Sequence, residues 1–248
     1  MKLIIFLCFY LLALPCFAIF KGEKVEPHSF TNFVGISTSL GDCGAIFISE
    51  AVLMTAAHCV TKTTKVIHDR SIRIALLNRN DDHSADVKKI VKQVSFDMDK
   101  DGTFLSDKSR FDVALIFLKK NLATSLGAEI FSLDDIVDTN STILDSELSI
   151  VAFGDDEIQK DLLKLRTQTY FIGLTENMAI KVNNKSLDSS LCPGDSGGIL
   201  FYEDHGPIKV LGILSAVTKY CGIQNQVSYV TPLFQNLEWI KSAINEDK

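Results

Sequence analysis

The chain has 248 residues, of which 46% are hydrophobic, 9% aromatic and 23% charged, and its formal net charge at pH 7 is −6. Such fractions are typical of a packed globular protein and leave little room for a long disordered tract. The acidic balance argues against a nucleic-acid partner and against an anionic membrane surface, because both require a basic face. The sequence has no internal repeat, which excludes a solenoid and a coiled coil.

The first 18 residues are predicted to be a secretory signal peptide. Lys2 precedes an apolar run, and small residues, Cys16 and Ala18, occupy the positions −3 and −1 of a cleavage after Ala18. An uncleaved anchor is the alternative, but the run is shorter than the roughly 20 residues that a membrane span requires. A lipid-modified Cys16 fits its flanking residues poorly. We therefore expect residues 19–248 to form a secreted domain, extracellular or periplasmic, that is free of the membrane.

Short apolar runs follow one another along the rest of the chain and predict β-strands. They are rich in Val, Ile and Phe and are bounded by Gly, Asn, Asp or Ser. Their succession favours a β-sandwich or barrel over alternating strands and helices. The predicted strands are Phe33–Ile36, Ala45–Ile48, Val52–Met54, Ile72–Leu77, Val113–Leu118, Leu148–Phe153, Tyr170–Leu174, Ile199–Tyr202, Val210–Val217 and Val227–Val230.

Two helices are expected. After Pro232, apolar residues recur at the three- and four-residue spacing of one helical face, from Leu233 to Ile244. A second, short helix is expected over Leu122–Ile136.

Three segments carry residue types used in nucleophilic catalysis. His58 ends the segment Thr-Ala-Ala-His and precedes a cysteine, Asp112 opens an apolar strand, and Ser196 is flanked by glycines in Gly-Asp-Ser-Gly-Gly. A serine hydroxyl needs an adjacent base, and a neutral imidazole suits that role because its pKa lies near 7. Each segment alone also has an ordinary structural interpretation, as a packed histidine, a turn aspartate or a tight loop.

Taken together, these segments resemble the trypsin-like (chymotrypsin-family) serine proteases, which carry the same motifs in the order His, Asp, Ser. Cys43-Gly44-Ala45 resembles the Cys-Gly-Gly of that family, and Glu238-Trp239-Ile240 resembles its C-terminal helix. The match is weakest over residues 120–190. The resemblance implies an all-β fold of two packed six-stranded antiparallel β-barrels with a C-terminal α-helix, and an active site in the cleft between the barrels.

The resemblance also implies a role for each residue of the site. His58 would take the proton of Ser196, and Asp112 would orient the imidazole. The backbone N–H groups of Gly194 and Ser196 would form the oxyanion hole. The implied activity is that of a monomeric serine endopeptidase that needs no metal and no cofactor. Its partners would be protein or peptide substrates and a protein inhibitor.

Export to an oxidising compartment makes the remaining cysteines candidates for disulfides. By the resemblance, Cys43 pairs with Cys59, which would clamp His58 onto its barrel, and Cys192 pairs with Cys221. A zinc site formed by Cys43, His58 and Cys59 is the alternative. It lacks both the Cys-x-x-Cys spacing and a reducing environment.

Activation in this family depends on a new N-terminal Ile or Val, whose ammonium group pairs with the Asp before the nucleophile. That residue is Asp195 here. The segment that begins at Ile19 resembles the family's start and directly follows the predicted cleavage. We therefore expect signal peptidase itself to generate the active terminus. Trimming by another protease is the alternative, whereas a start at Phe33 would lie too close to Cys43 to reach the pocket.

The residues that match the specificity pocket depart from those of trypsin. Ser190 stands where members that cut after Lys or Arg carry an Asp, so no buried charge awaits a basic side chain. Ser215 matches the family's serine at that point, and Val217 and Val227 stand where wide-pocket members carry Gly. Two valines would shorten the slot, which predicts small apolar P1 residues. The segment 215–217 would pair with the substrate as an added strand.

The same valines leave a second function open. A narrowed pocket, and Ala216 in place of the family's Trp, would also suit a catalytically quiet binding protein with the protease fold. An esterase or another acyl-transfer enzyme is a third possibility. The triad and oxyanion positions are all retained, however, and this favours an active protease.

Overall fold

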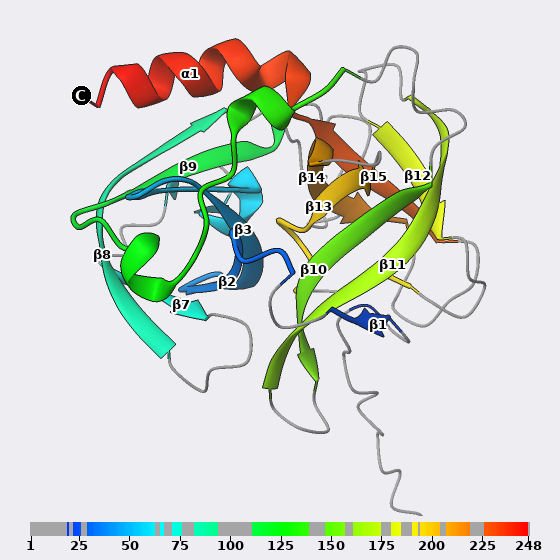
Figure 1. The fold of residues 1–248 in the computed structure, drawn as a ribbon, viewed down its shortest axis with the longest axis horizontal. Helices are drawn as coiled ribbons and strands as arrows, with labels where there is room; N and C mark the ends of the chain where they lie inside the picture. The colour runs from blue at the N-terminus through cyan, green and yellow to red at the C-terminus, as the bar shows by residue number, and fades with distance from the viewer. Residues whose placement is uncertain are drawn as a thin grey trace, which may run out of the picture.

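Two antiparallel β-structures lie side by side, and one helix, α1, crosses the top of the first (Figure 1). The computed structural model describes residues 19, 22–25, 29–62, 65–66, 71–75, 82–93, 111–138, 147–156, 161–174, 180–184, 190–192, 194–203, 207–218 and 226–247. Among these residues, no helix is long and apolar enough to cross a membrane.

The first structure is a closed barrel with the strand order β2-β3-β4-β9-β8-β7. Strands β4 and β9 are apolar and buried along almost their whole length, because the barrel interior lies on one side of them and packed chain on the other. Strand β7 instead alternates between exposed and buried residues near its start. The strands are β2 (Phe33–Thr38), β3 (Gly41–Ser49), β4 (Val52–Thr55), β7 (Ser71–Ala75), β8 (Asp82–Gln93) and β9 (Val113–Leu118).

The second structure has the strand order β1-β11-β10-β13-β14-β15-β12, and the additional pairing of β11 with β12 closes six of these strands into a ring. Its strands are β1 (Glu23–Lys24), β10 (Leu148–Asp156), β11 (Asp161–Leu174), β12 (Ile180–Asn184), β13 (Ile199–Glu203), β14 (Ile208–Val217) and β15 (Val227–Pro232). Two short strands, β5 (Thr61–Lys62) and β6 (Lys65–Val66), pair with each other outside both structures. The expected all-β double-barrel fold with a C-terminal helix is thus confirmed.

Aromatic rings hold the two barrels together. The ring of Phe33 on β2 lies 5.4 Å from that of Phe153 on β10, and the ring of Phe30 lies 4.7 Å from that of Phe201 on β13. Gly35 permits this close approach, because a Cβ atom there would lie 2.7 Å from Cδ1 of Phe153. The barrels therefore share one packed boundary, and the site described below lies where they meet.

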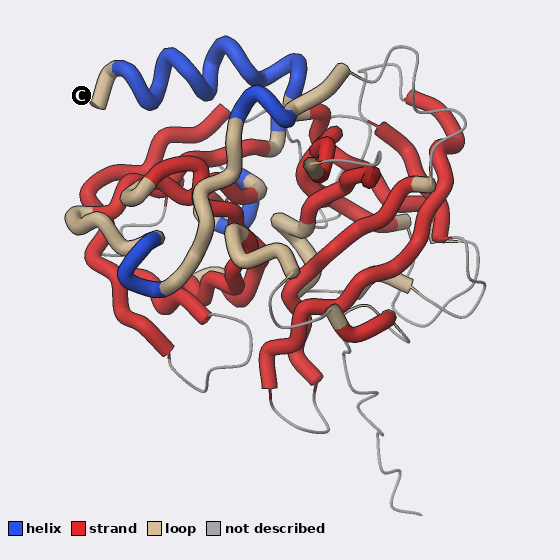
Figure 2. Tube along the Cα trace, in the orientation of Figure 1, coloured by secondary structure: helices blue, strands red, loops and turns tan. Residues whose placement is uncertain are grey.

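The C-terminal helix α1 (Leu237–Asn245) follows a 3₁₀ turn, η5 (Phe234–Asn236), and returns to the first barrel (Figure 2). Its buried residues, Ile240 and Ala243, belong to the core cluster of that barrel. Asp247 closes the contact with ion pairs to Lys88 and Lys89 of β8, at 3.0 and 2.8 Å. The end of the chain thereby ties the second barrel to the first.

The prediction of a helix over Leu122–Ile136 is wrong. The structure has two separate 3₁₀ turns there, η3 (Thr124–Leu126) and η4 (Leu133–Asp135). Gly127 ends the first turn in the left-handed conformation, with φ = 69°, so a helix cannot continue through it. The Ser132 hydroxyl accepts a hydrogen bond from the N–H of Asp134 and thereby caps the second turn.

Candidate active site

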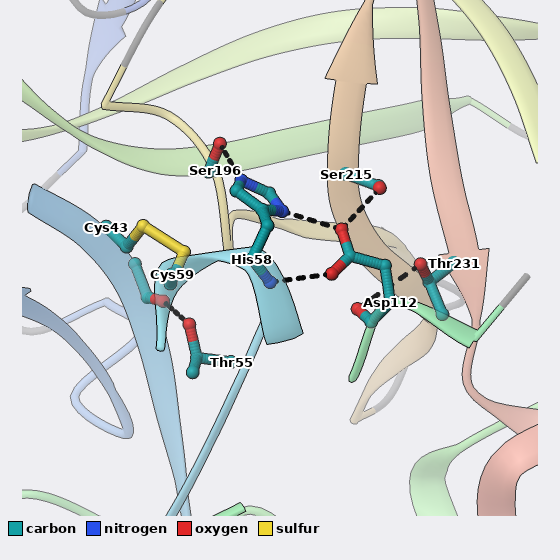
Figure 3. Close-up of polar contacts among 9 residues, drawn as sticks. Cys43, Thr55, His58, Cys59, Asp112, Ser196, Ser215 and Thr231 are labelled. Atoms are coloured by element: carbon teal, nitrogen blue, oxygen red, sulfur yellow. Dashed lines mark hydrogen bonds and ion pairs between the residues drawn. A yellow bond between two sulfur atoms is a disulfide. The ribbon is translucent and has the colours of Figure 1, made fainter. Parts of the chain in front are cut away.

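His58 lies in a 3₁₀ turn, η1 (Ala57–Cys59), that directly follows strand β4 (Figure 3). The neighbouring Cys59 forms a disulfide with Cys43 of β3, which fixes the turn to the barrel with a Cα–Cα distance of 6.3 Å. This pairing confirms the first expected disulfide and leaves neither thiol free to bind zinc. Cys192 is also disulfide-bonded. Its expected partner, Cys221, lies outside the described residues, so that pairing stays a prediction.

Three side chains from distant parts of the sequence form a continuous hydrogen-bonded row (Figure 3). Nδ1 of His58 lies 2.7 Å from Oδ2 of Asp112, and Nε2 of His58 lies 2.8 Å from Oγ of Ser196. The backbone N–H of His58 also donates to Oδ1 of Asp112 at 2.9 Å. His58 and Asp112 come from the first barrel, whereas Ser196 precedes β13 of the second, so the row spans the boundary between the barrels.

Asp112 is fully buried and is held in its ionised form by hydrogen-bond donors. Burial alone would raise the pKa of this carboxyl, but the charge and the N–H groups of His58 and the Ser215 hydroxyl lower it below its ordinary value. The Ser215 hydroxyl donates to Oδ2 at 2.5 Å, and the Thr231 hydroxyl donates to the backbone carbonyl of Asp112 at 3.4 Å. An ionised carboxylate accepts only, so Nδ1 of His58 carries the proton and Nε2 is left to accept the proton of Ser196.

The pKa of His58 shifts in the opposite direction. Burial lowers it, but the nearby carboxylate of Asp112 and its hydrogen bond raise it by more, so the net shift is upward. The imidazole is therefore a stronger base than an exposed histidine, and it stands within hydrogen-bond distance of a hydroxyl. This arrangement can take a proton from Ser196 and hold it.

The loop that carries Ser196 is seated against strand β3. The backbone N–H of Gly44 donates to the carbonyl of Ser196 at 2.7 Å, and the Thr55 hydroxyl donates to the carbonyl of Gly44 at 2.6 Å. Gly197 has a φ of +80°, and a Cβ atom there would lie 2.0 Å from the carbonyl oxygen of Gly44. Only glycine fits at this position.

Gly194 also has a positive φ, +99°, which turns the backbone just ahead of the serine. Within the described part of the chain, the N–H groups of Gly194 and Ser196 donate to no acceptor. Both N–H groups remain available to an oxygen atom that develops negative charge close to Ser196.

Asp195 is a second buried carboxylate beside the serine. The backbone nitrogen of Ile19 donates to its Oδ2 atom at 2.8 Å, and that of Cys192 donates to the same oxygen at 2.7 Å. Ile19 itself is only 1% exposed, and Gly22 closes a turn onto its carbonyl. Burial raises the pKa of Asp195 to about 8, although both N–H donors oppose the shift. A positive charge at Ile19 would relieve this shift.

The four residues expected in the specificity pocket differ in exposure. Ser190 and Ser215 are buried, at 1% and 4% exposed. Val217 and Val227 are partly buried and lie at adjoining ends of β14 and β15, where the N–H of Thr218 donates to the carbonyl of Val227 at 2.9 Å. Val217 packs against the core cluster of the second barrel.

Comparison with known proteins bears directly on this arrangement. The family model described as "Trypsin" matches residues 19–240, which is most of the chain. The chain belongs to the trypsin family.

Relatives in the trypsin family are distant in sequence. The chain is 25% identical over 258 residues to clotting factor C of Tachypleus tridentatus, a match that covers 91% of this chain and 25% of that protein. It is 25% identical to CLIP domain-containing serine protease B4 of Anopheles gambiae, and this match covers 90% of this chain and 69% of that protein. It is 24% identical to chymotrypsin of Phaedon cochleariae, and this match covers 92% of this chain and 83% of that protein. The chain thus spans about a quarter of the length of the first relatives.

Among solved structures, human heparin binding protein is similar in fold. The TM-score is 0.67 at 16% sequence identity, and the match covers 91% of this chain and 96% of that one. At this identity the likeness shows the fold alone.

The structure brings together every predicted residue of the triad and of the Ile19–Asp195 contact. Three polar residues that form hydrogen bonds next to the predicted site were not identified from the sequence: Thr55, Thr231 and Gln226. Thr55 belongs to the histidine motif, but only the register of β3 against the serine loop gives it a role. Among the described residues, no group of three or more His, Cys, Asp or Glu side chains is placed to hold a metal ion.

Proposed function

We propose that the protein is a secreted, monomeric serine endopeptidase that hydrolyses peptide bonds of protein substrates through an acyl-enzyme. The hydrogen-bonded row from Asp112 through His58 to Ser196 carries this proposal. Membership of the trypsin family and the available N–H groups of the serine loop support it.

The mechanism uses each group in the protonation state described above. Ser196 Oγ attacks the scissile carbonyl while Nε2 of His58 takes its proton, and His58 then passes that proton to the leaving amine. Asp112 stabilises the imidazolium that forms. The N–H groups of Gly194 and Ser196 donate to the oxyanion, and losing one such donor typically costs about 3–4 kcal/mol of transition-state stabilisation. Water, deprotonated by His58, releases the acyl group.

Removal of residues 1–18 is proposed to activate the enzyme, because it converts the buried N–H of Ile19 into an ammonium group next to Asp195. The 2.8 Å contact between these two residues supports the assignment. N-terminal sequencing of the active secreted protein should find Ile19 first. A different first residue on fully active material would refute the assignment.

The proposed substrate residue at P1 is small and apolar, such as Ala, Val or Ser. Ser190 supplies no charge at the pocket floor, and Val217 and Val227 carry side chains where wide pockets have none. The segment Ser215–Val217 is proposed to pair with the substrate backbone, and a protein inhibitor would use the same strand edge.

A panel of peptides that differ only at P1 tests both the reaction and its specificity. We expect kcat/KM to be highest for Ala and Val, lower for Phe and lowest for Lys. The variant Ser196→Ala should lose hydrolysis, whereas Ser125→Ala, which changes an exposed serine in η3, should retain it. Lys as the preferred residue, or hydrolysis that survives Ser196→Ala, would contradict the proposal.

The competing proposal is a non-catalytic binding protein. The side chains of Val217 and Val227, which would narrow the pocket, favour it, and the human protein of similar fold is named for binding heparin. The net charge of −6 gives this chain no overall attraction for a sulfated polyanion. Folded protein that begins at Ile19 yet hydrolyses none of the peptides would favour this function.

A further inference from the structure

Gln226 immediately precedes strand β15, and its side-chain amide both accepts from and donates to one backbone residue. The side-chain oxygen of Gln226 accepts from the N–H of Leu191 at 2.7 Å, and its nitrogen donates to the carbonyl of Leu191 at 2.7 Å. Gln226 is 1% exposed and Leu191 is completely buried. A side chain thus supplies the donor and the acceptor that a neighbouring strand would otherwise provide.

Leu191 lies between two parts of the site. Ser190, on one side, is the predicted floor of the specificity pocket. Cys192, on the other side, donates its N–H to the carboxylate of Asp195 at 2.7 Å. Asp195 directly precedes Ser196 in the chain. A shift of Leu191 would therefore move the pocket floor and the serine loop together.

We propose that Gln226 is a positioning residue, whose paired hydrogen bonds to Leu191 hold the pocket floor and the serine loop in register for catalysis. This inference rests on the proposed peptidase function. The disulfide at Cys192 limits how far residues 190–192 can move. It does not supply the two hydrogen bonds that fix the Leu191 peptide groups.

The variant Gln226→Glu tests the pair, because its chemistry changes with protonation while its shape does not. A carboxylate can accept from the N–H of Leu191, but it presents a second acceptor to the carbonyl of Leu191. A protonated carboxyl restores the donor. We therefore expect the ratio of kcat/KM between the variant and the wild type to rise as the pH falls from about 9 to about 6, given the ordinary Glu value near 4.3 and its rise on burial.

The ratio removes titrations that both proteins share. Protonation of His58 in acid lowers kcat/KM in both proteins, so this effect cancels in the ratio. Asp195 on the serine loop, Tyr229 further along β15 and Lys181, which lies opposite Tyr229 on β12, are charged or titratable residues near this segment, and all three are present in each protein. Gln235→Glu, the same change in the 3₁₀ turn η5 away from the serine loop, is the matched control. Its ratio should stay flat.

A second variant, Gln226→Leu, removes both hydrogen bonds at every pH. We expect kcat/KM to fall by about 10²-fold, the effect of displacing a reacting group by roughly 1 Å. The fall should appear in kcat as well as in KM, because the serine loop and the pocket floor move together. The unfolding free energy of each variant, from urea titration, verifies that the compared proteins are folded.

The outcomes separate this inference from the peptidase proposal. A ratio for Gln226→Glu that rises in acid, with a flat ratio for Gln235→Glu, supports the positioning role. A ratio near one at all pH values, or a low ratio that does not change with pH, overturns it. If the wild type hydrolyses nothing, the proposed function has failed and the positioning role fails with it. Even then, loss of the hydrogen bond to the Leu191 carbonyl would lower the stability of Gln226→Glu relative to the wild type as the pH rises.

Discussion

At the scale of single residues, the site depends on opposite pKa shifts in two touching groups. Asp112 is held ionised and His58 is held as a strengthened base, because each stabilises the charged form of the other against the effect of burial. Ser196 therefore lies beside a base, His58, that becomes neutral only when the pH exceeds its raised pKa.

Activity should therefore fall in acid through a pKa above the ordinary histidine value of about 6.5. The sign follows because only neutral His58 can take the proton of Ser196. The variant Ser215→Ala removes a donor to Asp112, and we expect it to lower kcat/KM by about 10- to 150-fold, since a hydrogen bond to a charged group contributes about 1.5–3 kcal/mol.

The pH dependence of kcat/KM, measured for the wild type and for Ser215→Ala, tests these expectations. Ser242→Ala, which changes an exposed serine of α1, serves as the control. An acid limb at or below that of a free histidine would contradict the account of His58.

Gly197 offers a second test at this scale. Alanine at this position would place its Cβ atom 2.0 Å from the carbonyl oxygen of Gly44 and would unseat the serine loop. We expect Gly197→Ala to abolish hydrolysis. Gly127→Ala is the control, because Gly127 has a similar positive φ of +69° but no atom within 4 Å of the added Cβ. It should lose only about 1–2 kcal/mol of stability and keep its activity. Equal effects of the two variants would refute the steric argument.

Single residues of the triad could be predicted from the sequence because each lies in a short motif with its own flanking pattern. Gln226 and Thr55 could not be assigned a role in the same way. Their partners, Leu191 and Gly44, are set by long-range contacts between segments that the local sequence does not specify.

At the scale of elements, the strand that the sequence predicted most accurately is buried along its whole length. Val113–Leu118 was predicted with its observed bounds, because its six consecutive apolar residues are β-rich and are flanked by the charged residues Asp112 and Lys119. Strand β8 (Asp82–Gln93) was missed because it carries charged side chains along most of its length. Strand β12 (Ile180–Asn184) was missed because only two of its five residues are apolar. Backbone pairing with neighbouring strands, rather than an apolar run, defines both.

The Cys43–Cys59 disulfide is the element-scale restraint on His58. The two cysteines are 16 residues apart in sequence, and closing a loop of that length contributes about 3 kcal/mol in the chain-entropy model. We expect the double variant Cys43→Ser/Cys59→Ser to lose about that much unfolding free energy and to lose activity at temperatures where it remains folded. Urea unfolding and peptide hydrolysis measure the two effects. A folded, fully active double variant would show that turn η1 does not need the clamp.

At the scale of the whole molecule, removal of residues 1–18 should change how stability depends on pH. In the full chain, the pKa of Asp195 is raised to about 8, so the folded form holds a proton that the unfolded carboxyl has released above about pH 4. Stability should therefore fall as the pH rises between these two values. In the chain that begins at Ile19, the ammonium group stabilises the carboxylate, so this fall should be smaller.

Urea unfolding of both chain forms, each carrying Ser196→Ala to prevent self-cleavage, measures this difference. Adding Asp195→Asn should remove the contribution of Asp195 to the pH dependence of stability in the full chain and should destabilise only the chain that begins at Ile19. The same pH dependence of the unfolding free energy in both forms would mean that the Ile19 ammonium group does not pair with Asp195.

Covalent labelling of Ser196 tests the proposed chemistry most directly. Folded protein that begins at Ile19 would be titrated with a fluorophosphonate at pH 8, and the labelled peptide identified by mass spectrometry. We predict one equivalent of label, located on Ser196 and absent from the variant Ser196→Ala. Folded protein that takes up no label, or a variant that still takes it up, would contradict the assignment of Ser196 as an activated nucleophile.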